Sequence, residues 1–367
     1  MADMKKIVAL FDAKGTVESI VPLGEGLIND TFLVRTLEPE APDYVLQRIN
    51  RHVFPDVEMV MRNISSVTAH IRHKLELAGT TDIDRRVLTF VRLRDDAQQL
   101  YAEVEDECWR MSRYIPRSVT KQQVDTQSSR EAGRAFGEFQ ALLADLKTPL
   151  GETIKNFHNM EFRLEQLREA VKEDRAGRLR ERRVQALLIK IERRANDMCR
   201  AERMGREGAL PKRVCHCDTK VNNILFDEGG DVLCVIDLDT VMPSFVFSDY
   251  GDFLRSAANT EPDDSARLDE VDFRMDIFEA FTAGYLESAR CFLLPQEVDN
   301  LPYAAQLFPY MQCVRFLWDY LQGDLYWKCS RPDHNLVRAE NQMRLLLSAE
   351  EKEPEMRDII KRLNSEL

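Results

Sequence analysis

A short predicted β-hairpin carries the side chains of this chain that are best suited to metal or phosphate chemistry. Two apolar runs, 223–226 and 232–236, flank the turn 227–230, which ends in Gly-Gly. A Gly-Gly turn between two apolar runs is a hairpin signal. The hairpin brings together its two ends, which carry Asp218, Asn223, Asp237 and Asp239. Carboxylates this close repel one another unless a proton or a hard cation neutralises them, and their oxygens suit Mg²⁺. The hairpin is therefore a candidate metal–phosphate site.

The spacing of these residues is similar to that of a kinase active site. Asp218 follows His216 by two positions, Asn223 comes five residues after Asp218, and an apolar strand then ends in Asp237. Protein kinases use this order for a catalytic Asp beside the substrate hydroxyl and for an Asn and a second Asp on Mg²⁺. The Arg of the kinase catalytic loop and the DFG motif are absent. The pattern instead resembles the aminoglycoside phosphotransferase and choline kinase superfamily, in which H-x-D-x-x-x-x-N precedes a strand that ends in I-D.

Composition indicates a globular protein large enough for two lobes. The chain has 367 residues, of which 44% are hydrophobic and 31% charged, and a formal net charge of −12. This negative charge argues against nucleic acid or an anionic membrane as the main partner. The eight cysteines lack framework spacing, and neither a signal peptide nor an apolar run of membrane length is evident. We therefore expect free thiols and a cytoplasmic protein.

The first 115 residues predict an antiparallel sheet with one long helix. A helix is expected over 54–73 and a shorter one over 1–12, with strands at 17–21, 31–34, 44–49, 87–93, 101–104 and 109–114. Between the first two strands lie Gly24 and Gly26. A strand, a G-x-G turn and a second strand allow backbone N–H groups to approach phosphates, although a plain hairpin turn has the same pattern.

The rest of the chain is predicted to be helical apart from the hairpin. The sequence Ile115-Pro116 marks the boundary, because proline disfavours helix before it and cannot extend a central strand. In a kinase-like arrangement this is the hinge, where the backbone of Tyr114 and Ile115 would face adenine. Helices are expected from 130 to 142, 161 to 203, 248 to 258, 272 to 289, 309 to 325 and 336 to 351.

Motifs along nearly the whole chain resemble the N-acetylhexosamine 1-kinase branch of that superfamily. They include Gly24-x-Gly26-x-Ile28-Asn29-x-Thr31, Phe54-Pro55-Asp56, His216 to Leu225, Ile236 to Pro243, Arg315-Phe316-Leu317 and His334-Asn335-Leu336-Val337-Arg338. Members of that branch phosphorylate the anomeric hydroxyl of N-acetylglucosamine or N-acetylgalactosamine with ATP and Mg²⁺. The resemblance implies a two-lobed, protein-kinase-like α/β (α+β) fold. Its antiparallel-sheet N-lobe (1–115) would bind nucleotide, and its mostly helical C-lobe (116–367) would hold the catalytic and sugar-binding residues.

The resemblance also implies roles for individual residues. Asp218 would accept the proton of the sugar 1-hydroxyl, while Asn223 and Asp237 would hold Mg²⁺. Asp239 would bind a second ion or support the first site. The nucleotide would meet Gly24, Gly26, Asn29, Thr31, Arg48, Tyr114 and Ile115, although Asn29 could instead reach the sugar. His216 would pin the catalytic loop, and Asp252 would steady it.

Arg315 and Tyr326 would contact the sugar. They lie eleven residues apart, so that one helix could present both on the same face. Without the resemblance, a surface ion pair between Arg315 and Asp319 is the simpler interpretation.

One feature departs from the kinase pattern. Kinases place a phosphate-binding Lys on the third strand, and here that strand reads Tyr44-Val45-Leu46-Gln47-Arg48-Ile49. Arg48 is the best substitute, but a shift of one residue would turn Gln47 inward instead. The acidic partner on the following helix, for which Glu58 is a candidate, is equally open.

Several other functions remain as alternatives. The segment 237–241 also fits the D-x-D-x-[TV] motif of haloacid-dehalogenase-like phosphatases, although the helical remainder lacks the strands which that fold needs. Cys215-His216-Cys217 could bind zinc, but no second ligand pair completes a site. A pseudokinase, or a kinase for choline, homoserine or an aminoglycoside, is also compatible with the motifs, although Arg315 would repel a cationic acceptor. The choice between gluco and galacto epimers and the oligomeric state stay open.

Overall fold

The computed structural model describes residues 4–24, 28–121 and 124–366, and its internal contacts divide the chain into two compact units. Unit 1 comprises Met1–Thr120, Asp145–Lys155 and Ile224–Met242, and unit 2 comprises Lys121–Ala144, Asn156–Asn223 and Pro243–Leu367. The hairpin after residue 223 thus belongs to unit 1. The lobe boundary that we placed after residue 115 stays a prediction.

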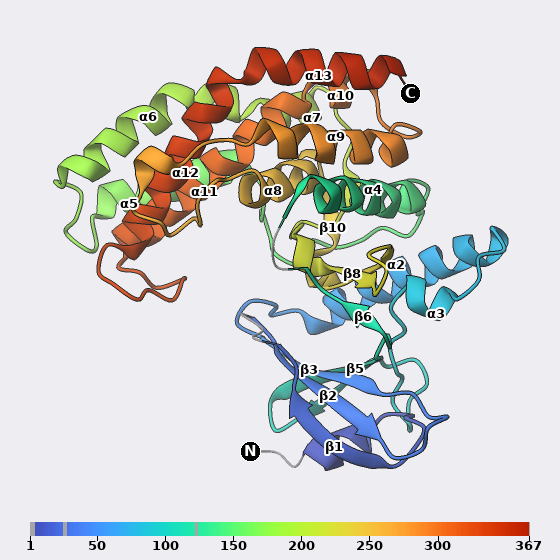
Figure 1. Cartoon of the computed structure of the whole chain (residues 1–367). Helices are drawn as coiled ribbons and strands as arrows, with labels where there is room; N and C mark the ends of the chain where they lie inside the picture. Colours follow the sequence, from blue (N-terminus) through green and yellow to red (C-terminus); the bar gives the residue numbers. More distant parts are fainter. Residues whose placement is uncertain (1–3, 25–27, 122–123, 367) are drawn as a thin grey trace. The chain divides into compact units, whose positions relative to one another are not determined.

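Unit 1 is built on a five-stranded antiparallel sheet with the order β1-β2-β3-β5-β4 (Figure 1). Its strands are β1 (Val17–Pro22), β2 (Asp30–Thr36), β3 (Tyr44–Ile49), β4 (Tyr101–Val104) and β5 (Glu107–Arg113). Side chains alternate between its two faces. One face packs Tyr44, Leu46 and Met111 into a core with the short helix α1 (Met4–Val8). The other face carries Gln47 and Arg110, which are direct neighbours across β3 and β5.

The strand predicted over 87–93 is wrong. Its segment forms only isolated bridges, Phe11 with Leu93 and Phe90 with Ser112. The N–H groups of Val91 and Leu93 donate to Met111 and Gln99, which belong to different segments. Because the hydrogen bonds go to separate partners, no continuous ladder forms.

A second, three-stranded sheet in unit 1 has the order β6-β8-β9 and contains the predicted hairpin. Its strands are β6 (Ser118–Val119), β8 (Ile224–Asp227) and β9 (Val232–Val235), and Ile224 pairs with Val235. The carboxylate of Asp227 accepts the N–H groups of Gly229 and Asp231, each at 2.9 Å, which closes the turn. The predicted hairpin is therefore confirmed. The helices of unit 1 are α1, α2 (Val57–Leu77) and α3 (Ile83–Arg86), and the 3₁₀ turn η2 (Leu238–Thr240) follows β9.

Unit 2 is mostly helical. Its helices are α4 (Thr126–Leu143), α5 (Met160–Glu173), α6 (Arg182–Met198), α7 (Arg200–Arg206), α8 (Phe247–Ala257), α9 (Met275–Ala289), α10 (Pro295–Asp299), α11 (Leu301–Gln322), α12 (His334–Glu351) and α13 (Glu353–Glu366). The remaining elements are β7 (Arg213–Cys215), β10 (Met242–Ser244, across the unit boundary) and the 3₁₀ turns η1 (Val221–Asn223) and η3 (Leu268–Glu270). The single block predicted over 161–203 is two separate helices and the start of a third, because Asp174 takes a left-handed conformation that ends α5. No helix in the described residues is long and apolar enough to cross a membrane.

Helices α4 and α9 of unit 2 pack closely at glycines. A Cβ atom on Gly284 would lie 1.9 Å from the carbonyl oxygen of Arg130, and one on Gly133 would lie 2.2 Å from that of Phe281. Only glycine permits this approach of the two backbones. Helix α8 also packs on α9, because Phe253 of α8 stacks on Phe281 with ring centroids 4.2 Å apart.

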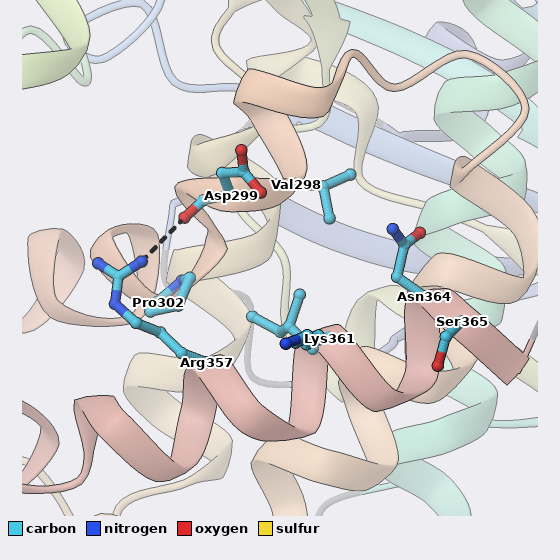
Figure 2. A pocket seen from close by; sticks show the side chains of 8 residues that line it. Val298, Asp299, Pro302, Arg357, Lys361, Asn364 and Ser365 are labelled. Carbon is cyan, nitrogen blue, oxygen red and sulfur yellow. Dashed lines mark hydrogen bonds between the residues drawn. The ribbon is translucent and has the colours of Figure 1, made fainter.

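A hollow of about 400 Å³ also lies in unit 2, between α13 and the segment from α10 to the start of α11 (Figure 2). Arg357 of α13 reaches across one end of it and donates to the carbonyl oxygen of Asp299 at 3.5 Å. The residues that line it are Val298, Asp299, Pro302, Arg357, Ile360, Lys361, Asn364 and Ser365. None of the predicted site residues is among them, so this hollow is separate from the candidate site.

We expect Gly284→Ala to lower the free energy of unfolding by about 3 kcal/mol, because the added methyl overlaps backbone that cannot move alone. Chemical denaturation of the purified chain measures this change. Glu138→Ala, at an exposed position of α4, is the control and should change stability by less than about 0.5 kcal/mol. Equal stability of the Gly284→Ala variant and the parent chain would contradict the close approach.

Candidate active site

The loop after β7, which carries Asp218, is anchored by one buried carboxylate. The backbone N–H groups of His216 and Cys217 donate to the two oxygens of Asp249 in α8, at 2.9 and 2.8 Å. The amide of Gln140 in α4 donates to the same carboxylate at 2.7 Å, and its own oxygen accepts the hydroxyl of Tyr285 at 2.6 Å. Asp249 is fully buried. A buried charge with this many donors fixes the loop to three helices.

The loop then turns sharply. Cys217 has a φ of 64°, which is uncommon for a residue with a side chain. The hydroxyl of Thr219 donates to the Asp249 carbonyl at 2.7 Å, and its N–H donates to the Asp252 carboxylate at 3.1 Å. Asp252 therefore supports the loop, as expected. His216 is buried against the rings of Phe136 and Phe139, which agrees with its expected pinning role.

Asp218 lies at the exposed side of this turn. Its carboxylate forms an ion pair with Lys220 at 2.7 Å, and it remains about one quarter exposed, at 26%. Burial opposes ionisation of Asp218, but the charge and hydrogen bond of Lys220, together with the nearby His216 and Arg255, outweigh it, so the pKa of Asp218 lies below its ordinary value. Asp218 is therefore an anion at neutral pH. Lys220 has a role here that the sequence reasoning missed, although its position two residues after Asp218 was visible.

Asn223 and Asp237 have features that suit metal ligands. The Asn223 amide nitrogen donates to the backbone carbonyl of Asp218 at 2.8 Å, which leaves Oδ1, the atom that could bind a cation, for another partner. Asp237 is exposed and follows β9 in a left-handed conformation, with a φ of 59°. Such backbone strain at a non-glycine residue is frequent at functional sites. The oxygens of an amide and a carboxylate are the donor types that Mg²⁺ prefers.

Asp239 has other partners. Both of its oxygens accept from the guanidinium of Arg110, and Oδ2 also accepts the amide of Asn29 at 2.6 Å. This geometry favours a supporting role for Asp239 over a second metal site. Arg110 on β5 was missed in the sequence reasoning, because a strand arginine has no local signal that tells which partner it meets.

The structure shows which of Gln47 and Arg48 on the third strand turns inward. Arg48 lies on the face opposite to Gln47 and forms ion pairs with Asp30 and Glu107 at the surface. Gln47 instead accepts from Arg110 at 3.0 Å. Arg48 therefore points away from Asp239 and from its partner Arg110. The candidate partner Glu58 is exposed in the first turn of α2.

The other predicted nucleotide contacts lie in unit 1. Ile115 packs with Leu233 and Cys234, next to Leu88, Leu225 and Ile236. The N–H of Tyr114 donates to the Asp43 carbonyl at 2.9 Å, so this donor is already used. The Thr31 hydroxyl accepts from Gln47, and Gly24 has a φ of 73°. Gly26 lies outside the described residues. The roles of these residues stay predictions.

The predicted acceptor residues belong to an arginine–aromatic cluster in unit 2. Arg315 is buried, and its guanidinium lies 5.3 Å from the ring centroid of Phe157, 5.1 Å from that of Trp327 and 6.0 Å from that of Tyr326. The cluster comprises Phe157, His158, Arg163, Arg315, Tyr326 and Trp327. In the described part of the chain, neither arginine of the cluster forms an ion pair with a carboxylate.

This excess of positive charge affects the titration of the cluster. Burial and the charge of Arg315 lower the pKa of Arg163 to about 9, and burial also lowers the pKa of Arg315. Burial and both arginines hold the pKa of His158 below its ordinary value. The Nδ1 atom of His158 is buried and has no hydrogen-bond partner in the described residues. The cluster is therefore suited to a ligand with hydrogen-bond acceptors and without positive charge.

A second buried carboxylate holds the aromatic part of this cluster. Asp319 of α11 accepts the N–H groups of Leu325, Tyr326 and Trp327 at 2.9, 2.8 and 3.1 Å, and the amide of Asn335 at 2.8 Å. These bonds fold the segment 323–327 back over the end of the helix.

One expectation about this region is wrong. Helix α11 ends at Gln322, before Tyr326, and Gly323 then turns left-handed with a φ of 97°. Arg315 and Tyr326 therefore do not share a helix, although the returning segment brings their side chains together. The alternative ion pair between Arg315 and Asp319 is absent from the described contacts, because Asp319 is occupied by the returning segment.

Comparison with known proteins identifies the family. A family model described as the phosphotransferase enzyme family matches residues 19–286. The chain belongs to this family. The matched segment of this phosphotransferase includes Asp218, Asn223 and Asp237 and ends before Arg315. The predicted superfamily is therefore confirmed, whereas the match does not reach the distal part of the arginine–aromatic cluster.

Solved structures agree with this assignment. An aminoglycoside phosphotransferase from Alicyclobacillus acidocaldarius is 15% identical, with a TM-score of 0.57 and coverage of 96% of each chain. A microcompartment-associated aminopropanol kinase is 15% identical, with a TM-score of 0.58 and coverage of 96% of this chain and 98% of that one. The amicoumacin kinase hAmiN in complex with AMP-PNP, Ca²⁺ and Ami is 13% identical, with a TM-score of 0.57 and coverage of 94% and 93%. At this identity the likeness shows the fold alone, and it confirms the predicted kinase-like α+β fold.

We expect Asp319→Asn to destabilise the phosphotransferase by about 3 kcal/mol, because an uncharged amide cannot replace a carboxylate that accepts from three N–H groups. Hydrogen exchange at Leu325, Tyr326 and Trp327 should become faster at the same time. Denaturation and exchange mass spectrometry measure the two effects. Lys328→Ala, at an exposed position in the following loop, is the control. Unchanged exchange in Asp319→Asn would contradict the proposed fold-back.

Proposed function

We propose that this phosphotransferase transfers the γ-phosphate of ATP to the anomeric 1-hydroxyl of an N-acetylhexosamine, either N-acetylglucosamine or N-acetylgalactosamine. We infer the class of the acceptor from the positive charge of the arginine–aromatic cluster. Several structural neighbours are named for acceptors that bear amines, namely aminoglycosides and aminopropanol. A buried guanidinium (Arg315) and a partly buried one (Arg163), neither in an ion pair with a carboxylate of the described residues, would repel an ammonium group but can donate to hydroxyl and carbonyl oxygens. Flanking aromatic rings suit the apolar face of a sugar.

Asp218 is proposed as the catalytic base. As an anion it can accept the proton of the acceptor hydroxyl and orient its oxygen toward the γ-phosphorus. An anomeric hydroxyl is more acidic than an ordinary alcohol, so a carboxylate with a low pKa suffices. Arg315 and Tyr326 would contact the sugar. The resemblance in sequence motifs supports the sugar-binding role of Arg315 and Tyr326, and the arrangement of the cluster supports it independently.

The nucleotide and metal assignments remain part of this proposal. Asn223 and Asp237 would hold Mg²⁺, which supplies neutralisation of phosphate charge when it is bound. Gly24, Gly26 and Thr31 would lie at the phosphates, and Tyr114 and Ile115 at the adenine. The apolar side chains around Ile115 support the adenine assignment, because they offer a surface on which a flat ring can pack.

The first test is ADP release from MgATP with a panel of acceptors. We expect turnover with an N-acetylhexosamine and a loss of about 10²–10⁴-fold in kcat for Asp218→Asn, because the base is removed while its shape is kept. The panel contains N-acetylglucosamine, N-acetylgalactosamine, glucose, choline, homoserine and kanamycin. Turnover with choline, homoserine or kanamycin alone would overturn the sugar assignment. Nucleotide binding without any turnover would favour a pseudokinase.

The pH dependence of this reaction should reflect the Asp218–Lys220 pair. The base works as an anion, so activity is present above the pKa of Asp218 and is lost as the pH falls through it. Lys220→Met removes the charge that lowers this pKa and leaves burial, which raises it. We therefore expect the acid limb of the kcat profile to move to higher pH. Lys361→Met, on the exposed face of α13, should leave the profile unchanged. An unmoved limb in Lys220→Met would contradict the role of the pair.

A further inference from the structure

The Arg110–Asp239 ion pair is the most deeply buried ion pair of unit 1 among the described residues. The two side chains are 2% and 3% exposed. Desolvating two charges costs several kcal/mol per ion, so such a pair persists only when further hydrogen bonds satisfy both groups. Here Asn29 supplies one of these bonds to Asp239, and Gln47 supplies one to Arg110.

These contacts form a chain of hydrogen bonds that the backbone from Asn29 to Thr31 closes into a ring. From Asp239 it passes through Arg110 on β5 and Gln47 on β3 to the hydroxyl of Thr31 on β2, at 3.2 Å. Asn29 lies two residues before Thr31 and returns to Asp239. Its Oδ1 also accepts the N–H of Asn50 at 2.9 Å, which fixes its side chain from the other end. Arg110 on β5 and Asn29 just before β2 thus meet at one carboxylate, and Gln47 on β3 supports Arg110.

That carboxylate lies on the turn that carries Asp237. Asp239 is two residues later, within the 3₁₀ turn η2. Val241, the residue that follows this turn, is also fixed by a hydrogen bond. Asn63 of α2 donates to the Val241 carbonyl at 3.0 Å and to the Gly151 carbonyl at 2.8 Å. Asp237 itself is exposed and keeps its left-handed backbone between β9 and this anchored turn. The anchor leaves little freedom for the backbone of Asp237.

We propose that Asn29 and Arg110 are positioning residues that act through Asp239 to orient Asp237 toward the metal ion of the nucleotide. In this arrangement Asp239 is an anchor and not a ligand. The acidic partner of Arg110 lies on the turn after β9. In kinases, the acidic partner of the third-strand Lys lies on a helix. This inference rests on the proposed function, because it requires a nucleotide–metal site at Asp237. It goes beyond that function because it gives a positioning role to two residues that touch neither substrate nor metal.

The test is calorimetric binding of ADP to the full chain, in EDTA and in excess Mg²⁺. The ratio of the two affinities is the metal-dependent gain, which needs no turnover. We expect Asp237→Asn to abolish most of this gain. Asn29→Ala and Arg110→Lys should lower it by about fivefold or more, while the affinity in EDTA stays within about twofold of the parent chain. A purely structural role would lower the melting temperature without this selective loss.

Matched variants keep the test decisive. Arg113→Lys changes an arginine of the same strand, whose pair with Asp84 is exposed, and should leave the gain unchanged. Where Arg110→Lys fails to fold, Gln47→Ala breaks the same chain of hydrogen bonds without leaving a buried charge unpaired. It should lower the gain in the same direction.

Three outcomes would overturn the inference. The first is an unchanged gain in folded Asn29→Ala and Arg110→Lys. The second is an equal loss of affinity in EDTA and in Mg²⁺ for Asn29→Ala, which would make Asn29 a direct nucleotide contact. The third is a gain that Asp239→Asn abolishes but Asn29→Ala preserves, which would make Asp239 a metal ligand. A parent chain that binds no ADP in either buffer would instead overturn the proposed function itself.

Discussion

The functional loops of this phosphotransferase depend on buried aspartates that accept hydrogen bonds from elsewhere in the chain. Asp249 accepts backbone N–H groups of the loop after β7, Asp319 accepts those of the segment with Tyr326, and Asp239 accepts the side chains of Arg110 on β5 and of Asn29 just before β2. A carboxylate cannot be buried without donors, and a loop N–H cannot be buried without an acceptor. Each group therefore satisfies the other, which stabilises the observed conformation.

The charges that lack such partners are informative for the same reason. Most arginines of the described chain meet a carboxylate, whereas Arg315 and Arg163 are held by aromatic rings and neutral oxygens. Keeping two guanidiniums together costs stability, and burial lowers the pKa of both. Such an arrangement is consistent with a binding site that is completed by its ligand.

Much of the local structure could be predicted from short patterns. The hairpin after Asn223, the strands β1 to β3 and the helices α8, α9 and α12 follow from alternation, helical spacing and turn residues. The segment 87–93 was predicted wrongly, because its β-branched and aromatic residues satisfy isolated bridges in place of a ladder. The end of α11 was also missed, because Asp319, inside the helix, draws the following segment back on itself. Local propensity does not reveal such a long-range acceptor.

The sequence by itself determined the order of the chemical groups along the chain: a carboxylate, an amide and a second carboxylate, at the spacings of a kinase motif. It also determined the family, because those spacings are the motif. Only the tertiary structure decided the partners of each charge. Arg48 is the candidate that the sequence offers on the third strand, yet the pleat turns it to the surface, whereas Arg110 of β5 meets Asp239. Partner choice depends on which faces of distant strands meet, and packing of the whole chain decides that.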